Sequence, residues 1–271
     1  MPKIRVNKVD IHYEEHGHGE PVALLNGIMQ NTAGWAFQTP VLARRYRVIL
    51  HDLRGQGLSD KPDGAYTWDD HVEDFRALLD ALGVARTHLI GVSYGAEVAM
   101  HFALKYPERV AALVLGTAAS ELTPLLRAFA ESWEVAAGCR DGRKFFKLFA
   151  PSVYGNAFYA THADWLEQRA DLFAKVVTDE WFAAFERLLA NFYTLDITAR
   201  LPAIQVPTLV VAAEKDVVKP VELSALIARQ IRQAELVVIA DSGHAALLEK
   251  PAEFNTAILG FLAKYGLTAK H

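Results

Sequence analysis

The chain has 271 residues, of which 52% are hydrophobic and 22% charged, and its formal net charge is −4. This composition is typical of a globular protein that buries a large core. Basic and acidic residues are interspersed, so no cationic stripe is available for a phosphate backbone, and we expect no binding to nucleic acid.

The N-terminal residues alternate charged with apolar side chains and contain neither a signal peptide nor a membrane-spanning run. The single cysteine, Cys139, excludes an intramolecular disulfide and a Cys-based zinc site. His12, His16 and His18 lie in or before a glycine-rich turn and lack the spacing of metal ligands. We therefore expect a cytoplasmic protein without contact to membranes, without a metal and without a cofactor.

Short apolar runs recur along the chain, separated by segments with helical periodicity. Residues 4–15 alternate at period two, which is typical of an exposed antiparallel start. The later runs are rich in Val, Leu or Ile and apolar nearly throughout, as parallel strands covered on both faces should be. They comprise residues 21–27, 46–52, 87–93, 110–118, 207–216 and 234–244.

Residues 68–83 show the pattern expected of the intervening helices. Val72, Phe75, Leu79 and Leu82 fall on one helical face, and Gly83 supplies a stop. Strand and helix patterns that alternate in this way predict an α/β fold with a mostly parallel sheet and helices on both faces.

The alternation stops between residues 120 and 200, where the pattern is helical only. This interval holds more than half of the aromatic residues of the chain, among them Trp133. Inserted after the strand at 110–118, it is expected to lie over the carboxyl ends of the sheet, where open α/β folds bind ligands. We therefore predict a core of residues 1–119 and 201–271 and a helical cap of residues 120–200.

The segment GVSYG places Ser93 between two glycines, after a predicted strand and before a predicted helix. Such a G-x-S-x-G turn is sharp because strand and helix approach closely, and it exposes the serine hydroxyl at the end of the sheet. Ser93 is therefore a candidate nucleophile.

A nucleophilic serine needs a base and an acid that orients the base. His244 follows the last predicted strand and Asp216 ends the strand before it, so the chain order is Ser, Asp, His. Glu121 and Asp241 are alternative acids. Asp241 is close to His244 in sequence, which favours a role in holding the loop.

Attack on a carbonyl also requires donors for the oxyanion. We expect these to be the backbone N–H of Tyr94, next to the nucleophile, and that of Ile28, with Met29 as the alternative. The loop that begins at Asn26 and Gly27 follows the first parallel strand. The candidates for substrate contact are Asn26, Gly27 and Met29 of this loop and Trp133 of the aromatic-rich interval.

The segment DLRGQGLSDKP holds further polar residues beside this rim. Asp52, Arg54 and Ser59 are interpreted as organising their loop through hydrogen bonds rather than as reacting groups. His51 ends a strand on the same rim, and a contact with substrate is a minor hypothesis for it.

Four segments together resemble the α/β-hydrolase superfamily: HDLRGQGLSDKP, GVSYG, IQVPTLVVAAEKD and DSGHAALLEKPAEF. The resemblance covers nearly the whole chain. It implies an eight-stranded, mostly parallel sheet, a helical cap over residues 120–200 and a Ser93, Asp216, His244 triad. Two departures are Asn26-Gly27, where many members have His-Gly, and Ala213, where many have Gly. The Asn-Gly form is similar to a minority branch that includes bacterial enzymes joining hydroxyacyl chains into glycolipid precursors.

These features favour a serine hydrolase that cleaves a carboxylic ester or a related small-molecule acyl compound through an acyl-enzyme, with an apolar acyl or aromatic substrate. Acyl transfer with the same triad is the main alternative, and C–C hydrolysis and perhydrolysis are lesser ones. A non-catalytic small-molecule receptor is a further hypothesis, because fold alone does not define activity.

Overall fold

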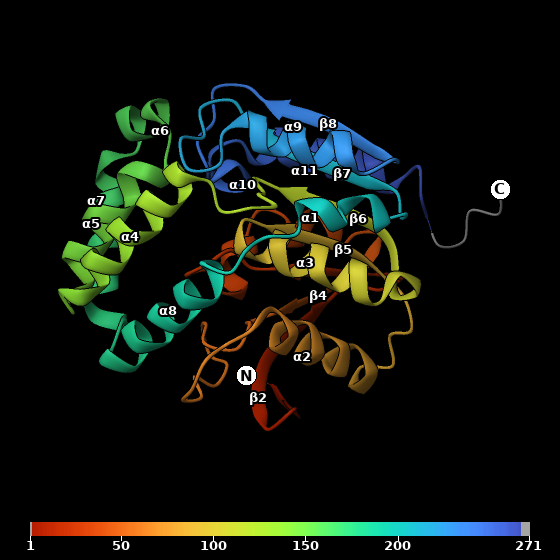
Figure 1. Ribbon diagram of the computed structural model, residues 1–271, viewed down its shortest axis with the longest axis horizontal. Helices are drawn as coiled ribbons and strands as arrows, with labels where there is room; N and C mark the ends of the chain where they lie inside the picture. Colours follow the sequence, from red (N-terminus) through yellow and green to blue (C-terminus); the bar gives the residue numbers. More distant parts are fainter. Residues whose placement is uncertain (1, 267–271) are drawn as a thin grey trace.

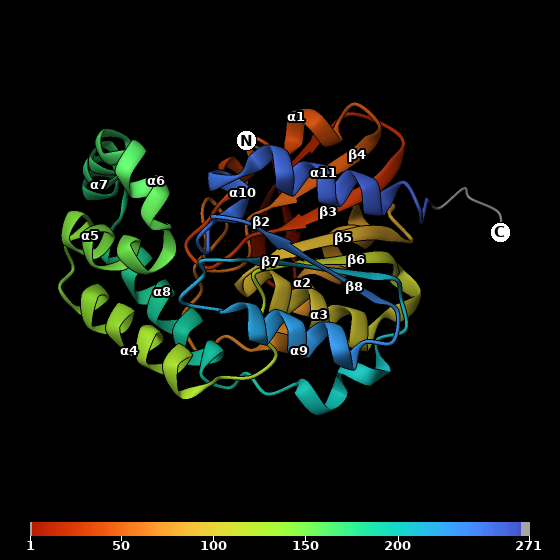
Figure 2. The ribbon, with the colours of Figure 1, turned by 90° about the horizontal axis from the view of Figure 1, so that it is seen from above.

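The computed structural model describes residues 2–266, and its centre is one eight-stranded sheet (Figures 1 and 2). The strand order is β1-β2-β4-β3-β5-β6-β7-β8. β2 pairs antiparallel with β1 and with β4, and all other neighbouring strands pair in parallel. The predicted eight-stranded, mostly parallel sheet is confirmed. Its strands are β1 (Lys3–Val6), β2 (Val9–His16), β3 (Glu20–Leu25), β4 (Tyr46–His51), β5 (Thr87–Val92), β6 (Val110–Gly116), β7 (Thr208–Ala213) and β8 (Ala234–Ile239).

The central strands are apolar throughout because both of their faces are covered. Successive side chains of a strand point to opposite faces, so Leu89 of β5 joins one core cluster and Ile90 joins the other. Strands β5, β6 and β7 are buried along their whole length. This accounts for the continuous apolar runs in the sequence.

Strand β8 differs from this expectation. Its run is as apolar as those of the inner strands, yet Leu236, Val237 and Val238 are 40%, 37% and 43% exposed. β8 is an edge strand, with a neighbour on one side only. The prediction that every apolar run is covered on both faces is therefore wrong for this strand.

Helices cover both faces of the sheet. In Figure 2 one face carries α2 (Trp68–Ala81), α3 (Tyr94–Lys105) and α9 (Val221–Gln230), and the other carries α1 (Thr39–Leu42) and α11 (Pro251–Leu262). α2 begins with a capping box between Thr67 and Asp70. It ends before Gly83, whose φ of 67° is the left-handed conformation expected at that stop.

The helices that follow β6 lie together on one side of the molecule (Figures 1 and 2). They are α4 (Pro124–Gly138), α5 (Gly142–Val153), α6 (Asn156–Thr161), α7 (Ala163–Val176) and α8 (Asp179–Phe192). The division into two domains at residues 120 and 200 stays a prediction.

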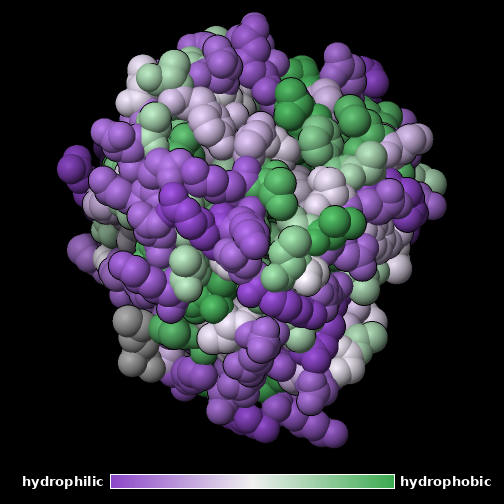
Figure 3. Space-filling model, turned by 90° about the vertical axis from the view of Figure 1, so that its left-hand side faces the viewer, coloured by the Kyte–Doolittle hydropathy of each residue, from purple (hydrophilic) through white to green (hydrophobic). Residues whose placement is uncertain are grey.

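Most aromatic residues of this helical group pack against one another. Phe145 of α5 makes ring contacts with Phe173, Trp181, Phe182 and Phe185 of α7 and α8. Their abundance in the interval thus reflects the core of the helical group as well as any binding surface. On the outer face, hydrophobic patches alternate with hydrophilic side chains (Figure 3). Within residues 2–266, no helix is both long enough and apolar enough to cross a bilayer.

Candidate active site

Ser93 occupies the sharp turn between β5 and α3. Its φ of 50° and ψ of −122° are strained for a residue with a side chain, a cost of about 1–3 kcal/mol. The turn is this tight because a Cβ atom on Gly91 would lie only 2.4 Å from the carbonyl oxygen of Gly95. Small residues on both sides therefore allow α3 to cross β5, and the Ser93 side chain is directed away from the sheet.

The structure brings Ser93, His244 and Asp216 together. His244 Nε2 lies 2.9 Å from Ser93 Oγ, and His244 Nδ1 lies 2.7 Å from Asp216 Oδ2. The other carboxylate oxygen of Asp216 accepts hydrogen bonds from the backbone N–H groups of Val218 (2.9 Å) and Lys219 (2.8 Å). The carboxylate is thus held in one orientation toward the imidazole ring.

Neither alternative acid contacts His244. Glu121 accepts a hydrogen bond from Thr198 Oγ1 at 3.0 Å, and the side chain of Asp241 is 61% exposed and 3.7 Å from Lys250. Asp216 is therefore the carboxylate that the fold places on the ring.

A second carboxylate positions the loop that carries His244. Glu249 of α10 (Ala246–Glu249) accepts hydrogen bonds from the backbone N–H of Gly243 at 2.9 Å and of Gly155 at 3.2 Å. Burial raises the pKa of Glu249, although both backbone donors favour the charged form. Glu249 thereby joins the histidine loop to the linker between α5 and α6.

The loop after β3 lies across from the nucleophile. The Gly27 N–H donates to Gln30 Oε1 at 2.9 Å, and a Cβ on Gly27 would lie 3.3 Å from the Cβ of Ser93. Within residues 2–266 the N–H of Ile28 makes no hydrogen bond. Tyr94 is the first residue of α3, so its N–H has no acceptor within the helix. Both N–H groups are free to donate, as the predicted oxyanion hole requires.

Asn26 does not line the cavity beside Ser93. It is fully buried and donates to the carbonyl oxygen of His51 at 2.9 Å, while its Oδ1 accepts from Trp35 Nε1 at 2.7 Å. The structure thus shows Asn26 as a support of the loop, in contrast to the predicted contact with substrate. Its partners lie on β4 and in the 3₁₀ helix η1 (Thr32–Trp35), which the local sequence does not reveal.

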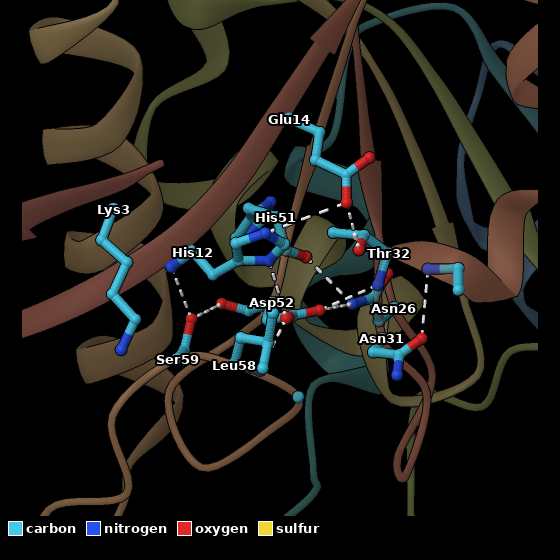
Figure 4. A network of polar contacts seen from close by, with 12 residues as sticks. Lys3, His12, Glu14, Asn26, Asn31, Thr32, His51, Asp52, Leu58 and Ser59 are labelled. Carbon is cyan, nitrogen blue, oxygen red and sulfur yellow. Dashed lines mark hydrogen bonds and ion pairs between the residues drawn. The ribbon is translucent and has the colours of Figure 1, made fainter. Parts of the chain in front are cut away.

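Asp52 is the centre of the network that holds this loop (Figure 4). One carboxylate oxygen accepts from the Thr32 N–H at 2.8 Å and from Asn26 at 3.3 Å. The other accepts from the Leu58 N–H at 2.8 Å and lies 3.0 Å from His12 Nδ1. Four residues meet at one buried carboxylate, as the interpretation of a loop-organising residue requires.

Arg54, Ser59 and His51 also lie outside the reacting groups. Arg54 forms a bidentate pair with Asp74, and Ser59 donates to the Asp52 carbonyl at 2.6 Å. The His51 ring is buried and stacks on Phe75 at 5.2 Å, and burial lowers its pKa to about 4. His51 does not line the cavity beside Ser93.

That cavity has a volume of about 150 Å³ and is mostly apolar. Gly27, Met29 and Trp133, which are candidates for substrate contact, line it together with Ser93 and His244. A wider hollow of about 500 Å³ adjoins it and shares part of its wall with it. The shared residues are Met29, Gln30, Gly34, Phe146, Tyr154, Phe173 and Leu248.

Three polar residues of the site are absent from the sequence-based prediction. Gln30 orders the loop at Gly27, and a buried pair of Glu97 and Lys219 lies behind Ser93. Burial raises the pKa of Glu97, whereas Lys219 and the Ala119 N–H favour its carboxylate form. One signal was available: Glu97 is an acidic residue in the otherwise apolar run GAEVAM, one helical turn after Ser93.

A parallel sheet with a serine at a strand-to-helix turn and an Asp-His pair at the same edge defines a class of hydrolases. The chain belongs to the α/β hydrolase fold family, whose model matches residues 20–251. It is 33% identical to "Putative carbamate hydrolase RutD" of Variovorax paradoxus, over 94% of this chain and 96% of that protein.

Two solved structures are also similar. MGS-M2, an α/β hydrolase from a Medee basin deep-sea metagenome library, is 30% identical with a TM-score of 0.93, over 97% of each chain. A thermophilic esterase from Thermogutta terrifontis is 30% identical with a TM-score of 0.86, over 97% of this chain and 98% of that chain.

Proposed function

We propose that the protein is a serine hydrolase that cleaves a carboxylic ester or a related acyl compound through an acyl-enzyme. The observation that carries this proposal is the unbroken hydrogen-bonded series from Asp216 through His244 to Ser93 Oγ, at the wall of an apolar cavity. A serine hydroxyl becomes a useful nucleophile only with such a base beside it.

In the proposed reaction each group has one role. Asp216 holds the Nδ1–H of His244, so Nε2 is free to accept the Ser93 proton as Oγ bonds to the substrate carbonyl carbon. The N–H groups of Tyr94 and Ile28 stabilise the oxyanion. His244 then protonates the departing alcohol, which leaves as its bond to carbon breaks.

Water completes the reaction by the same route. His244 takes a proton from water as the water oxygen bonds to the acyl carbon, and returns it to Ser93 Oγ as that ester bond breaks. The free acid and the free serine are the products.

The cavity supports an apolar acyl or aromatic substrate. Its wall includes Phe146, Phe149 and Val153 of α5 and Phe173 of α7. Hydrophobic lining of this kind stabilises ligands by excluding water from their apolar groups. The similar protein named an esterase supports ester cleavage, and the one named a carbamate hydrolase supports cleavage of a related carbonyl compound.

The test is turnover of nitrophenyl esters, thioesters and lactones of graded acyl length, with Ser93→Ala as the control. We expect ester turnover that Ser93→Ala abolishes. Full activity in Ser93→Ala would overturn the proposal, and absence of turnover across the panel would favour a binding protein. Adding candidate alcohols separates hydrolysis from acyl transfer, because free acid as the sole product in every reaction would exclude transfer.

A further inference from the structure

A buried ion pair lies directly behind the proposed nucleophile. Lys219 Nζ is 2.9 Å from both carboxylate oxygens of Glu97, and the two side chains are 2% and 0% exposed. The same nitrogen lies 3.3 Å from Ser93 Oγ. Lys219 lies in the loop after β7, which also carries Asp216, and thus connects that loop to α3, the helix that begins after Ser93.

Stability alone does not explain this pair. Removing two charges from water costs several kcal/mol, and replacement of a buried ion pair by apolar residues is often neutral or stabilising. Burying Glu97 and Lys219 at the reacting oxygen therefore suggests a role in the reaction.

The pair also leaves no net charge to attract a substrate carboxylate. Both Glu97 oxygens face the ammonium group, and one of them also accepts from the Ala119 N–H at 3.0 Å. An anionic substrate would meet the Glu97 carboxylate as well as the Lys219 ammonium. The remaining role for Lys219 is thus to donate a hydrogen bond to Ser93.

The direction of that hydrogen bond follows from chemistry. An ammonium group only donates, so Ser93 Oγ must be the acceptor from Lys219. The hydroxyl hydrogen of Ser93 is then left for His244 Nε2, 2.9 Å away on the other side. Lys219 therefore orients the Ser93 proton toward the base.

We propose that Lys219 is a fourth catalytic residue, which donates a hydrogen bond to Ser93 Oγ, and that Glu97 is the residue that positions it. This inference rests on the proposed serine-hydrolase function. When Oγ loses its proton to His244, negative charge develops on Oγ, and the ammonium donor stabilises it. The same donor stabilises the negative charge on Oγ as it departs from the acyl carbon and takes the proton back from His244.

The experiment compares two double variants in which a buried ion pair becomes neutral. Lys219→Met/Glu97→Gln removes the donor without leaving an unpaired buried charge. Arg54→Met/Asp74→Asn is the matched control, because that pair is also largely buried, with 10% and 5% side-chain exposure, and lies outside the cavity beside Ser93. Single Lys219→Met and Glu97→Gln variants complete the set.

Three quantities are measured: the Tm, kcat/KM for a nitrophenyl ester, and the rate at which diethyl p-nitrophenyl phosphate labels Ser93. The labelling rate reports the nucleophile itself, which a purely structural role in a folded protein would not change. We expect the Lys219 variants to lose about 10- to 100-fold in both rates, as removal of a charge-assisted donor should cause. Glu97→Gln retains the donor and loses less, and the Arg54/Asp74 control retains the wild-type rates.

Wild-type rates in a folded Lys219→Met/Glu97→Gln variant would overturn the inference and leave the serine-hydrolase proposal intact. Equal losses in that variant and in the Arg54/Asp74 control would also overturn it, because they would show a general effect of removing a buried pair. If the wild-type protein neither turns over esters nor is labelled at Ser93, the proposed function itself fails.

Discussion

Gly95 at the start of α3 lies against the backbone of Leu25 at the end of β3. A Cβ atom on Gly95 would be 2.2 Å from the Leu25 carbonyl oxygen and 2.5 Å from its carbonyl carbon. Backbone atoms of a central strand have no freedom to move aside. The second glycine of GVSYG is therefore required by the approach of helix to sheet at the point where the loop after β3 begins.

The first prediction concerns this contact. Gly95→Ala should destabilise the protein by about 3 kcal/mol, because one methyl group must displace the end of β3. The matched control is Gly260→Ala in α11, where a Cβ meets no atom within 4 Å and alanine favours the helix. Urea unfolding of both variants checks the prediction, and equal stability of the two would contradict it.

The second prediction separates the candidate acids. Asp216→Asn should lower kcat on the order of 10⁴-fold, because the amide no longer favours the His244 tautomer that accepts the Ser93 proton. Glu121→Gln should leave kcat nearly unchanged, since Glu121 contacts Thr198 rather than the imidazole. Steady-state kinetics on one ester decides the matter, and a larger loss in Glu121→Gln would show that Asp216 is not the acid.

The third prediction tests the support of the loop after β3, which carries the proposed oxyanion donor Ile28. Asn26→Ala leaves the buried Trp35 N–H and the His51 carbonyl without their partner, which should cost about 2 kcal/mol of stability. A shifted loop should also lower kcat/KM by about 10- to 100-fold. The control Asn31→Ala removes only an exposed cap of η1 and should cost about 1 kcal/mol at most.

Thermal unfolding and ester turnover of the two variants provide the measurement for this loop. An Asn26→Ala protein with wild-type kcat/KM would show that the loop does not depend on the buried amide.

The fourth prediction concerns pH. Burial lowers the pKa of His51 to about 4, whereas an unfolded histidine titrates near 6.5. Between these values the unfolded chain binds a proton that the folded protein does not, so this group destabilises the fold as pH falls from 6.5 toward 4. His51→Leu removes that term. Its free energy of unfolding relative to wild type should rise by about 2 kcal/mol between pH 7.5 and pH 5.

Urea unfolding of both proteins at the two pH values measures this difference. Neither ring nitrogen of His51 has a hydrogen-bond partner within residues 2–266, so His51→Leu removes no hydrogen bond of the ring. A difference that is the same at pH 7.5 and pH 5 would show that folding does not lower the pKa of His51.

Much of the architecture was predictable because it depends on local patterns. Apolar runs of strand length and segments of helical period identify the layers, since each element must bury one or both faces. The turn at Ser93 is also local, because strand, glycines and helix are contiguous in sequence. Chain order then predicted that Asp216 and His244 would reach the same edge of the sheet, where the structure brings them to hydrogen-bond distance.

The tertiary structure alone decided contacts between segments that are distant in sequence. The apolar pattern of β8 does not reveal that this strand is an edge, because strand order is a property of the whole sheet. The sequence shows Asn26 only as a loop residue, whereas the structure shows that it hydrogen-bonds Trp35 and the carbonyl of His51. Periodicity shows that a side chain is buried, whereas only the complete packing shows which polar atoms form hydrogen bonds with it. Lys219 and Glu97, 122 positions apart, meet at Ser93 because the sheet brings the ends of β5 and β7 to one edge.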